Sequence, residues 1–251
     1  MNKERDWLQK NDGAAPEGSQ YEQYKREEFL YKLKQNIPHM KELDCLELGC
    51  AHGEMTELLA ADFRSVVAVD GASRYVKETY KKVHILGNVK VVEAMFEDVN
   101  NRAKFDVGIL FHVLEHVKNP EQLLMKVRKR MSLGGKIAIV VPNAEALSRQ
   151  LAVKMGLLER RHDLSDRDEK HGHLRVYDRG ELLFQIGQAG LKVISMYGLS
   201  LKLFCDSQME EFLSRGIIGE SQIQGLWKLA DEHINLAGAL MVVAKDKNDV
   251  F

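Results

Sequence analysis

Residues 46–54, LELGCAHGE, join an apolar run to a turn that is bracketed by two glycines. Residues 54–61 then have the pattern of a helix, and a second apolar run at residues 66–69 ends on Asp70 and Gly71. This order of strand, glycine turn, helix, strand and acid is typical of a mononucleotide-binding half of a doubly wound sheet. The segment therefore predicts a nucleotide-type ligand, with Asp70 placed to accept hydrogen bonds from ribose hydroxyls.

The spacing of the glycines distinguishes between nucleotide cofactors. A dinucleotide fingerprint has the spacing G-x-G-x-x-G, with the pyrophosphate at the helix N-terminus. Here Gly49 and Gly53 are separated by three residues with Ala51 between them, and Glu47 precedes the first glycine by two positions. A carboxylate repels a pyrophosphate and suits a ligand that carries an ammonium or sulfonium group. The turn therefore argues against a dehydrogenase.

This pattern resembles motif I of the class I S-adenosylmethionine-dependent methyltransferases. Two later segments are similar to the fourth and fifth strands of that family: FDVGILFHVLEHVKNP at residues 105–120 and LGGKIAIVVPN at residues 133–143. The resemblance implies an α/β, Rossmann-like, doubly wound sheet of seven strands, mostly parallel with one antiparallel strand. It implies S-adenosylmethionine as the cofactor, in an enzyme of the small-molecule type found in bacterial glycan, natural-product and ubiquinone pathways.

Composition limits the class of protein further. A chain of 251 residues with 45% hydrophobic content is long enough for one sizeable domain. A net charge of −1 gives no electrostatic footprint for nucleic acid. Three cysteines do not suggest a disulfide framework, and neither a secretory signal nor a membrane span is apparent. We therefore expect a cytoplasmic protein with no membrane or nucleic-acid partner; its oligomeric state stays open.

The polar residues 1–18 are expected to form a flexible N-terminus, and residues 19–251 a single methyltransferase domain. Within it, residues 19–36 (a helix capped by Ser19) and residues 144–177 (inserted after the fifth strand) are expected to cover the site as lid elements.

The resemblance also implies the cofactor site. Glu47 would hold the methionine-side ammonium through backbone or water, the glycine turn would surround the cofactor, and an N-terminal tyrosine would fold over it, with ordinary packing as the alternative. Where many relatives place an adenine-binding acid, this chain has apolar residues, which can clamp an adenine face or plug the core. The candidate cofactor-binding residues are Tyr21 (or Tyr24), Glu47, Gly49, Cys50, Ala51, Gly53, Asp70, Gly71, Met95, Phe96 and Phe111.

Histidines are the candidate catalytic bases, because the pKa of histidine lies near neutrality. His112 follows the fourth strand, and ligands of open α/β sheets bind at the carboxyl ends of strands. His173 lies in the lid segment GHLRVY, residues 172–177, where Tyr177 is expected to orient the acceptor. His116 is expected to make a buried hydrogen bond instead.

Three histidines after the fifth strand are candidate zinc ligands: His162, His171 and His173. Structural zinc usually takes four ligands that include cysteine, and no cysteine is near these residues in the sequence. No metal site is therefore expected. Four arginines would suit an anionic acceptor such as a nucleotide sugar, with ordinary surface positions as the alternative. They are Arg149, Arg160, Arg161 and Arg175.

The predicted function is methyl transfer from S-adenosylmethionine to a hydroxyl of a small polar acceptor, such as a sugar, a glycan precursor or a secondary metabolite. An N-methyltransferase and a quinone-type O-methyltransferase are alternatives. A non-catalytic nucleotide-binding protein is the alternative from another class.

Overall fold

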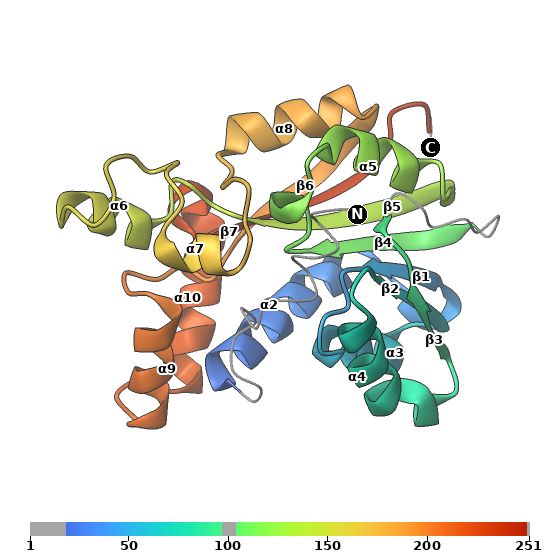
Figure 1. Ribbon diagram of the computed structural model, residues 1–251, viewed down its shortest axis with the longest axis horizontal. Helices are drawn as coiled ribbons and strands as arrows, with labels where there is room; N and C mark the ends of the chain where they lie inside the picture. The colour runs from blue at the N-terminus through green and yellow to red at the C-terminus, as the bar shows by residue number, and fades with distance from the viewer. Residues whose placement is uncertain (1–18, 97–103, 250–251) are drawn as a thin grey trace.

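The computed structural model describes residues 19–96 and 104–249, so the expected flexible N-terminus lies outside the described residues. Seven strands form one sheet in the order β3-β2-β1-β4-β5-β7-β6 (Figure 1). Strands β1 to β5 pair in parallel, whereas β7 is antiparallel to both β5 and β6. The predicted fold class is confirmed. The strands are β1 (Asp44–Leu48), β2 (Ser65–Asp70), β3 (Val89–Glu93), β4 (Phe105–Phe111), β5 (Met131–Pro142), β6 (Leu191–Leu199) and β7 (Ala239–Asp246).

Helices cover both faces of this sheet (Figure 1). On one face, α5 and α8 pack on a core cluster that includes Leu123 and Leu182; on the other, α2 and α3 pack through Phe29 and Leu59. The central strands are buried on both sides, which explains their nearly continuous apolar sequences. The helices are α2 (Gln20–Asn36), α3 (Glu54–Asp62), α4 (Ser73–Val83), α5 (Pro120–Arg128), α6 (Leu147–Lys154), α7 (Asp166–Lys170), α8 (Arg179–Gln188), α9 (Asp206–Ser214) and α10 (Glu220–Glu232). Short 3₁₀ turns are η1 (Met40–Glu42), η2 (His84–Leu86), η4 (Leu114–His116) and η5 (Ile234–Leu236).

Asn143 follows β5 and does not cap the helix that comes next, α6. Its buried side-chain amide donates to the carbonyls of Asn235 (3.0 Å) and Ala237 (2.8 Å), and its side-chain oxygen accepts from the backbone of Glu145. Because these bonds tie the end of β5 to the segment before β7, α6 begins only at Leu147. The side chain therefore fixes the root of the segment inserted after β5.

Helix α2 is anchored by a buried cation. The Lys32 side chain is 1% exposed and donates to the Gly198 carbonyl (2.7 Å) and to Asp231 Oδ1 (2.6 Å). Its Nζ also lies 3.4 Å from a carboxyl oxygen of Glu28, whose pKa burial raises to about 7 against the opposing charge of Lys32. These bonds fix α2 on β6 and α10. The first turns of α2 therefore form a fixed side of the cavity at the carboxyl edge of the sheet.

Candidate active site

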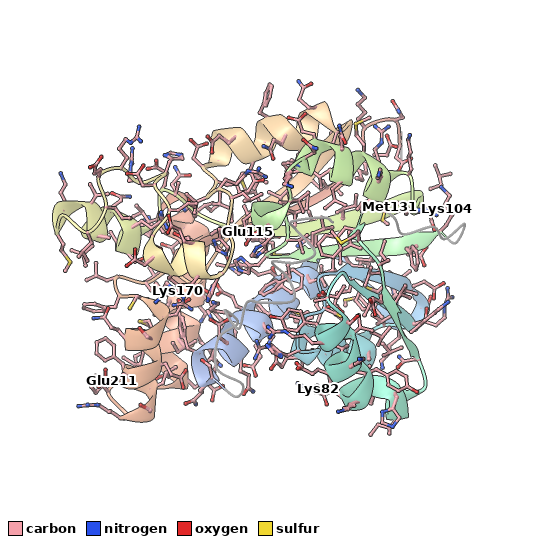
Figure 2. All side chains as sticks on the ribbon, in the orientation of Figure 1. Lys82, Lys104, Glu115, Met131, Lys170 and Glu211 are labelled. Atoms are coloured by element: carbon pink, nitrogen blue, oxygen red, sulfur yellow. The ribbon has the colours of Figure 1, made fainter. Side chains whose placement is uncertain are left out.

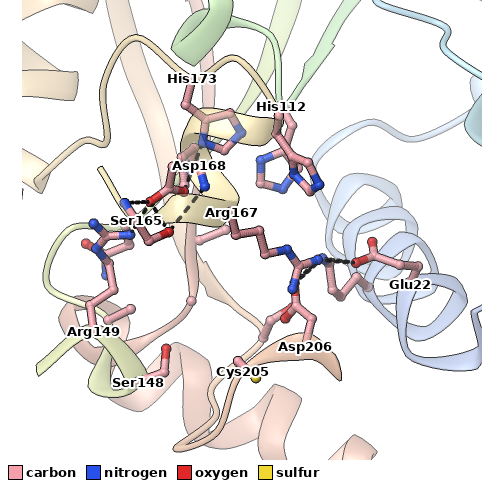
Figure 3. Close-up of a pocket in the computed structure, with 18 of the residues that line it drawn as sticks. Glu22, His112, Ser148, Arg149, Ser165, Arg167, Asp168, His173, Cys205 and Asp206 are labelled. Carbon is pink, nitrogen blue, oxygen red and sulfur yellow. Dashed lines mark hydrogen bonds and ion pairs between the residues drawn. The ribbon is translucent and has the colours of Figure 1, made fainter. Parts of the chain in front are cut away.

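A cavity of 1210 Å³ opens at the carboxyl edge of the sheet. Its walls come from the ends of β1, β2, β4 and β5, from α2, from α6 and α7, and from residues 200–208 (Figure 3). A volume of about 300–1,000 Å³ accommodates one drug-sized ligand, so this cavity has room for a cofactor and an acceptor together. The expected lid elements 19–36 and 144–177 contribute to it, but the contribution of residues 200–208 was not predicted.

The glycine turn after β1 has the backbone of a ligand cradle. Gly49, Ala51 and Gly53 all have positive φ angles, of 79°, 44° and 82°. A Cβ on Gly49 would lie 3.0 Å from a methyl group of Val113, and one on Gly53 would lie 3.0 Å from the backbone of Thr79. Both positions therefore require glycine, and the turn brings bare backbone to the cavity wall.

Asp70 joins this turn to the end of β2. One of its carboxylate oxygens accepts from the backbone of Ala51 (3.1 Å) and the other from the backbone of Ala72 (2.9 Å). Burial raises the pKa of Asp70, and these N–H donors oppose that shift. Each oxygen keeps acceptor capacity, and the residue lines the cavity. A pair of ribose hydroxyls fits this carboxylate.

Six of the eleven predicted cofactor residues line the same cavity: Gly49, Cys50, Ala51, Asp70, Phe96 and Phe111. Phe96 lines the cavity and also packs against the core, so its contact with adenine stays a prediction. Gly53, Gly71 and Met95 lie outside the cavity lining, and Gly53 is the N-cap of α3. The cradle thus fits a nucleoside whose ribose meets Asp70 and whose base meets an aromatic side chain. The glycine spacing argues against a ligand with a pyrophosphate.

Glu47 has a different partner from the expected one. Its side chain is 1% exposed, does not line the cavity and accepts a hydrogen bond from Thr56 Oγ1 (2.7 Å). Burial and the nearby charge of Asp70 raise its pKa to about 8, although the bond from Thr56 opposes them. The carboxyl group therefore supports the turn from the interior, by fixing the first turn of α3.

This raised pKa predicts a pH dependence of stability. A carboxyl whose pKa is raised from 4.5 to about 8 on folding binds more protons in the native state, so it stabilises the fold at low pH. That contribution is lost as the pH rises through the folded value. Glu47→Gln keeps a neutral partner for Thr56, so we expect the free energy of unfolding to fall less steeply between about pH 5 and about pH 9 than in the wild type. Urea unfolding at several pH values in that range measures the free energy of unfolding of both proteins. Equal slopes of this free energy against pH would contradict the raised pKa of Glu47. The contribution of Glu28, whose pKa is also raised, is the same in both proteins and cancels in the comparison.

Tyr21 does not cover the cofactor site; that prediction is wrong. Its ring is 3% exposed and packs with Met209, Leu213 and Ile223, and Tyr24 packs against the same cluster. Successive turns of a helix place residues three or four apart on one face, and this face of α2 is turned toward α9. The neighbouring face presents Glu22, Lys25 and Arg26 to the cavity instead.

The two predicted bases both reach the cavity, and each has a carboxylate partner (Figure 3). His112, with a positive φ of 56°, places Nδ1 2.9 Å from Glu115 Oε1. His173 places Nδ1 3.1 Å from Asp168 Oδ1. A carboxylate partner keeps the proton on Nδ1 and leaves Nε2 with a free electron pair. Each pair therefore has the arrangement of an oriented general base.

The partners of these histidines were missed at the sequence level. Burial raises the pKa of Asp168, but bonds from His173, Ser165 and Arg149 outweigh it and hold this pKa well below its usual range. Burial likewise opposes the lowered pKa of Glu115, which His112 stabilises in its charged form. For Glu115 a signal existed, because it follows His112 by three positions in the sequence. For Asp168, the spacing from Ser165 is typical of a helix start, but it does not identify Asp168 as the partner of His173.

Tyr177 lies in the core and not in the cavity, so its expected contact with the acceptor is wrong. It is 1% exposed, and its hydroxyl donates to the Leu114 carbonyl (3.3 Å). The cause is a parallel bridge from Tyr177 to Asn143, which continues the sheet and turns the ring inward. The histidine trio that was weighed for zinc does not assemble either, because His162 pairs with Asp178 (3.3 Å).

Comparisons with known proteins show the family to which the chain belongs. Residues 20–196, more than half of the chain, match the methyltransferase-domain family, so the chain belongs to that family. Fold, cradle and family together define a class I S-adenosylmethionine-dependent methyltransferase with S-adenosylmethionine as its cofactor, as the sequence motifs predicted. In the described residues no helix is both long and apolar enough to cross a membrane.

Individual relatives are more distant. The chain is 30% identical over 112 residues to the ubiquinone biosynthesis O-methyltransferase of Rickettsia akari (strain Hartford), which covers 42% of each protein. It thus spans less than half the length of this curated relative. The N-methyltransferase NodS of Bradyrhizobium japonicum WM9, solved with S-adenosyl-L-homocysteine, is similar in fold over 97% of both chains (TM-score 0.61, 13% identity). The [4+2]-cyclase SpnF is equally similar (TM-score 0.60, 15% identity, 94% of this chain and 85% of that one), so these likenesses show the fold alone.

Proposed function

We propose that this methyltransferase acts on a hydroxyl group of a small acceptor, which binds between His112, His173 and α6. The observation that carries the proposal is the pair of carboxylate-oriented histidines on the acceptor side of the cofactor cradle. A hydroxyl nucleophile gains reactivity when a base removes its proton as the new bond forms, whereas an uncharged amine has no such need.

Bound S-adenosylmethionine supplies a methyl group made electrophilic by the positive charge on sulfur. Asp70 and the glycine turn would hold the ribose end of this cofactor, and Phe96 and Phe111 would offer it apolar contacts. His112 Nε2 takes the acceptor proton while Glu115 holds Nδ1–H and balances the charge that develops on the ring. Positioning and the exclusion of water supply the remainder of the acceleration.

Ion pairs at the mouth of the cavity assist that exclusion. Arg167, from α7, lies 3.2 Å from Asp206 and 4.0 Å from Glu22 of α2, and so bridges two walls (Figure 3). The bridge joins three segments that are distant in the sequence. We infer that it holds the cavity closed over the bound substrates.

The lining of the acceptor end favours a partly apolar molecule. Helix α6 and the loop after it contribute several aliphatic side chains to the wall, of which Met155 (61% exposed) and Leu157 (69%) form the outer lip. A phenolic or quinol ring with an apolar substituent fits this wall better than a sugar does. The ubiquinone-pathway relatives support this second candidate.

The arginines considered for an anionic acceptor have other partners. Arg149 bonds to Asp168 and to the carbonyls of Arg161 and Asp163, and Arg175 bonds to carbonyls around η4. Arg160 and Arg161 do not line the cavity. These contacts favour an uncharged acceptor.

A label-transfer assay tests the proposal. The protein is incubated with methyl-labelled S-adenosylmethionine and three matched acceptors: a catechol with an alkyl chain, a hexose and a primary amine. We expect label in the catechol, with little in the other two. Transfer to the amine alone would contradict the proposal, and tight cofactor binding with no transfer to any acceptor would favour a non-catalytic binding protein.

A further inference from the structure

Three side chains on the inner wall of the cavity converge. Glu115, His116 and His173 each bring one potential ligand atom to within 4.8 Å of the others. Two of them belong to η4 and the third to the loop after α7. The backbone fixes these segments together, since Leu174 N donates to the Glu115 carbonyl (2.7 Å). The convergence is therefore built into the fold.

Glu115 lacks a full set of partners for a buried carboxylate. Glu115 is 0% exposed, and Figure 2 labels it near the middle of the view. Its Oε1 accepts a hydrogen bond from His112 Nδ1. Among the described residues, Oε2 has no hydrogen-bond partner. An unpartnered charged oxygen in the interior is costly. A cation held beside it would remove that cost.

The two histidines are oriented as metal ligands usually are. His173 Nδ1 lies 3.1 Å from Asp168 Oδ1, and Asp168 is itself held by Arg149 (2.9 Å) and Ser165. His116 Nδ1 lies 3.3 Å from the Gly172 carbonyl. In metal sites an oxygen partner on the second ring nitrogen fixes the tautomer of a ligating histidine, as in the carboxylate–histidine–zinc arrangement.

We propose that Glu115, His116 and His173 form a site for a divalent transition-metal ion of the Zn²⁺ type, with its open position facing the acceptor. Two imidazoles and one carboxylate suit Zn²⁺ and its neighbours, whereas Mg²⁺ prefers oxygen ligands. Bond lengths of about 2.1 Å place such ligands about 3–3.5 Å apart, so small side-chain rotations complete the site.

The sequence pattern does not predict this site, because His173 is distant from Glu115 and His116 along the chain and meets them only in the folded structure. Its consequence for catalysis rests on the proposed function. An acceptor hydroxyl bound to the ion would have a lowered pKa, and His112 would take its proton. In this arrangement His173 is a ligand and His112 alone is the base.

Metal binding can be measured without an acceptor. Protein freed of metal by a chelator is titrated with Zn²⁺ by calorimetry and with Co²⁺ by visible absorption, whose ligand-field bands report imidazole coordination. We expect one equivalent to bind and Mg²⁺ to compete poorly. His173→Asn and Glu115→Gln should each weaken binding by about 100-fold or more, and Asp168→Asn by about 10- to 100-fold through loss of orientation.

A second cluster supplies the matched control. His162, Asp178 and Glu181 also converge, but their residues are more exposed. His162→Asn should leave the high-affinity site unchanged. Equal affinity in the wild type and His173→Asn, loss of the site in His162→Asn, or no saturable binding would overturn the proposal.

Binding of S-adenosylhomocysteine by each variant checks the fold and separates the two proposals. Glu115 is fully buried, so His173→Asn, at a partly exposed position, keeps the test valid if Glu115→Gln fails to fold. If the protein binds Zn²⁺ but transfers no label, the metal site is supported and the proposed function is overturned. If it transfers label but binds no metal, the proposed function is supported and the metal site is overturned.

Discussion

Replacing Asp70 by asparagine is expected to weaken the binding of S-adenosylmethionine and S-adenosylhomocysteine by about 100-fold or more. Hydrogen bonds to a charged group contribute about 1.5–3 kcal/mol each, and two ribose hydroxyls would lose their charged acceptor. In asparagine one of the two carboxylate oxygens becomes an NH₂ group, which is a donor. This group would face the backbone N–H of either Ala51 or Ala72, and that hydrogen bond would be lost. The turn itself would therefore be disturbed, and calorimetric titration measures the combined loss.

Asp62→Asn is the matched control for this experiment. Asp62 ends α3, pairs with Lys34 (2.8 Å) and does not line the cavity, so its removal should leave the affinity unchanged. An Asp70→Asn protein that is folded and binds S-adenosylhomocysteine as tightly as the wild type would contradict the assignment of the ribose site.

Replacing His112 by asparagine is expected to lower kcat by about 10²- to 10⁴-fold, the usual contribution of a general base. The affinity for S-adenosylhomocysteine should not change, because the cradle is formed by other residues. Asparagine is chosen because it tolerates the left-handed backbone that His112 adopts. Steady-state kinetics with the acceptor found by the label-transfer assay measures the loss.

His39→Asn tests whether backbone strain explains any loss. His39 has the same φ of 56°, is exposed and lies outside the cavity lining. Its replacement should leave kcat unchanged. A His112→Asn protein with full activity would show that this residue does not take the proton, whereas a fall in both variants would indicate a general effect on folding.

Much of the cofactor site was predictable because it is encoded locally. The glycine turn and Asp70 lie on consecutive strands whose order fixes their positions, and a positive φ at Gly49 or Gly53 is a requirement that a single residue type meets. The seven-stranded, mostly parallel sheet also followed from the family resemblance of three short motifs, and the structure confirms it.

The errors and omissions have a different physical origin. The directions of Tyr21 and Tyr177 depend on which neighbour each backbone segment packs against, and both rings turned into the core. Likewise, the pair of Asp168 and His173 lies beside Glu115 only because the segment after β5 folds back onto η4. A single sequence does not encode such long-range contacts in any local pattern.

Calorimetric titration of the wild-type protein with S-adenosylhomocysteine, beside NAD, tests the central claim most directly. The glycine spacing, the family match and the Asp70 carboxylate predict saturable binding of one equivalent of the sulfur compound and no binding of NAD. Binding of NAD, or no binding of S-adenosylhomocysteine, would contradict the assignment of this cavity to a methyltransferase.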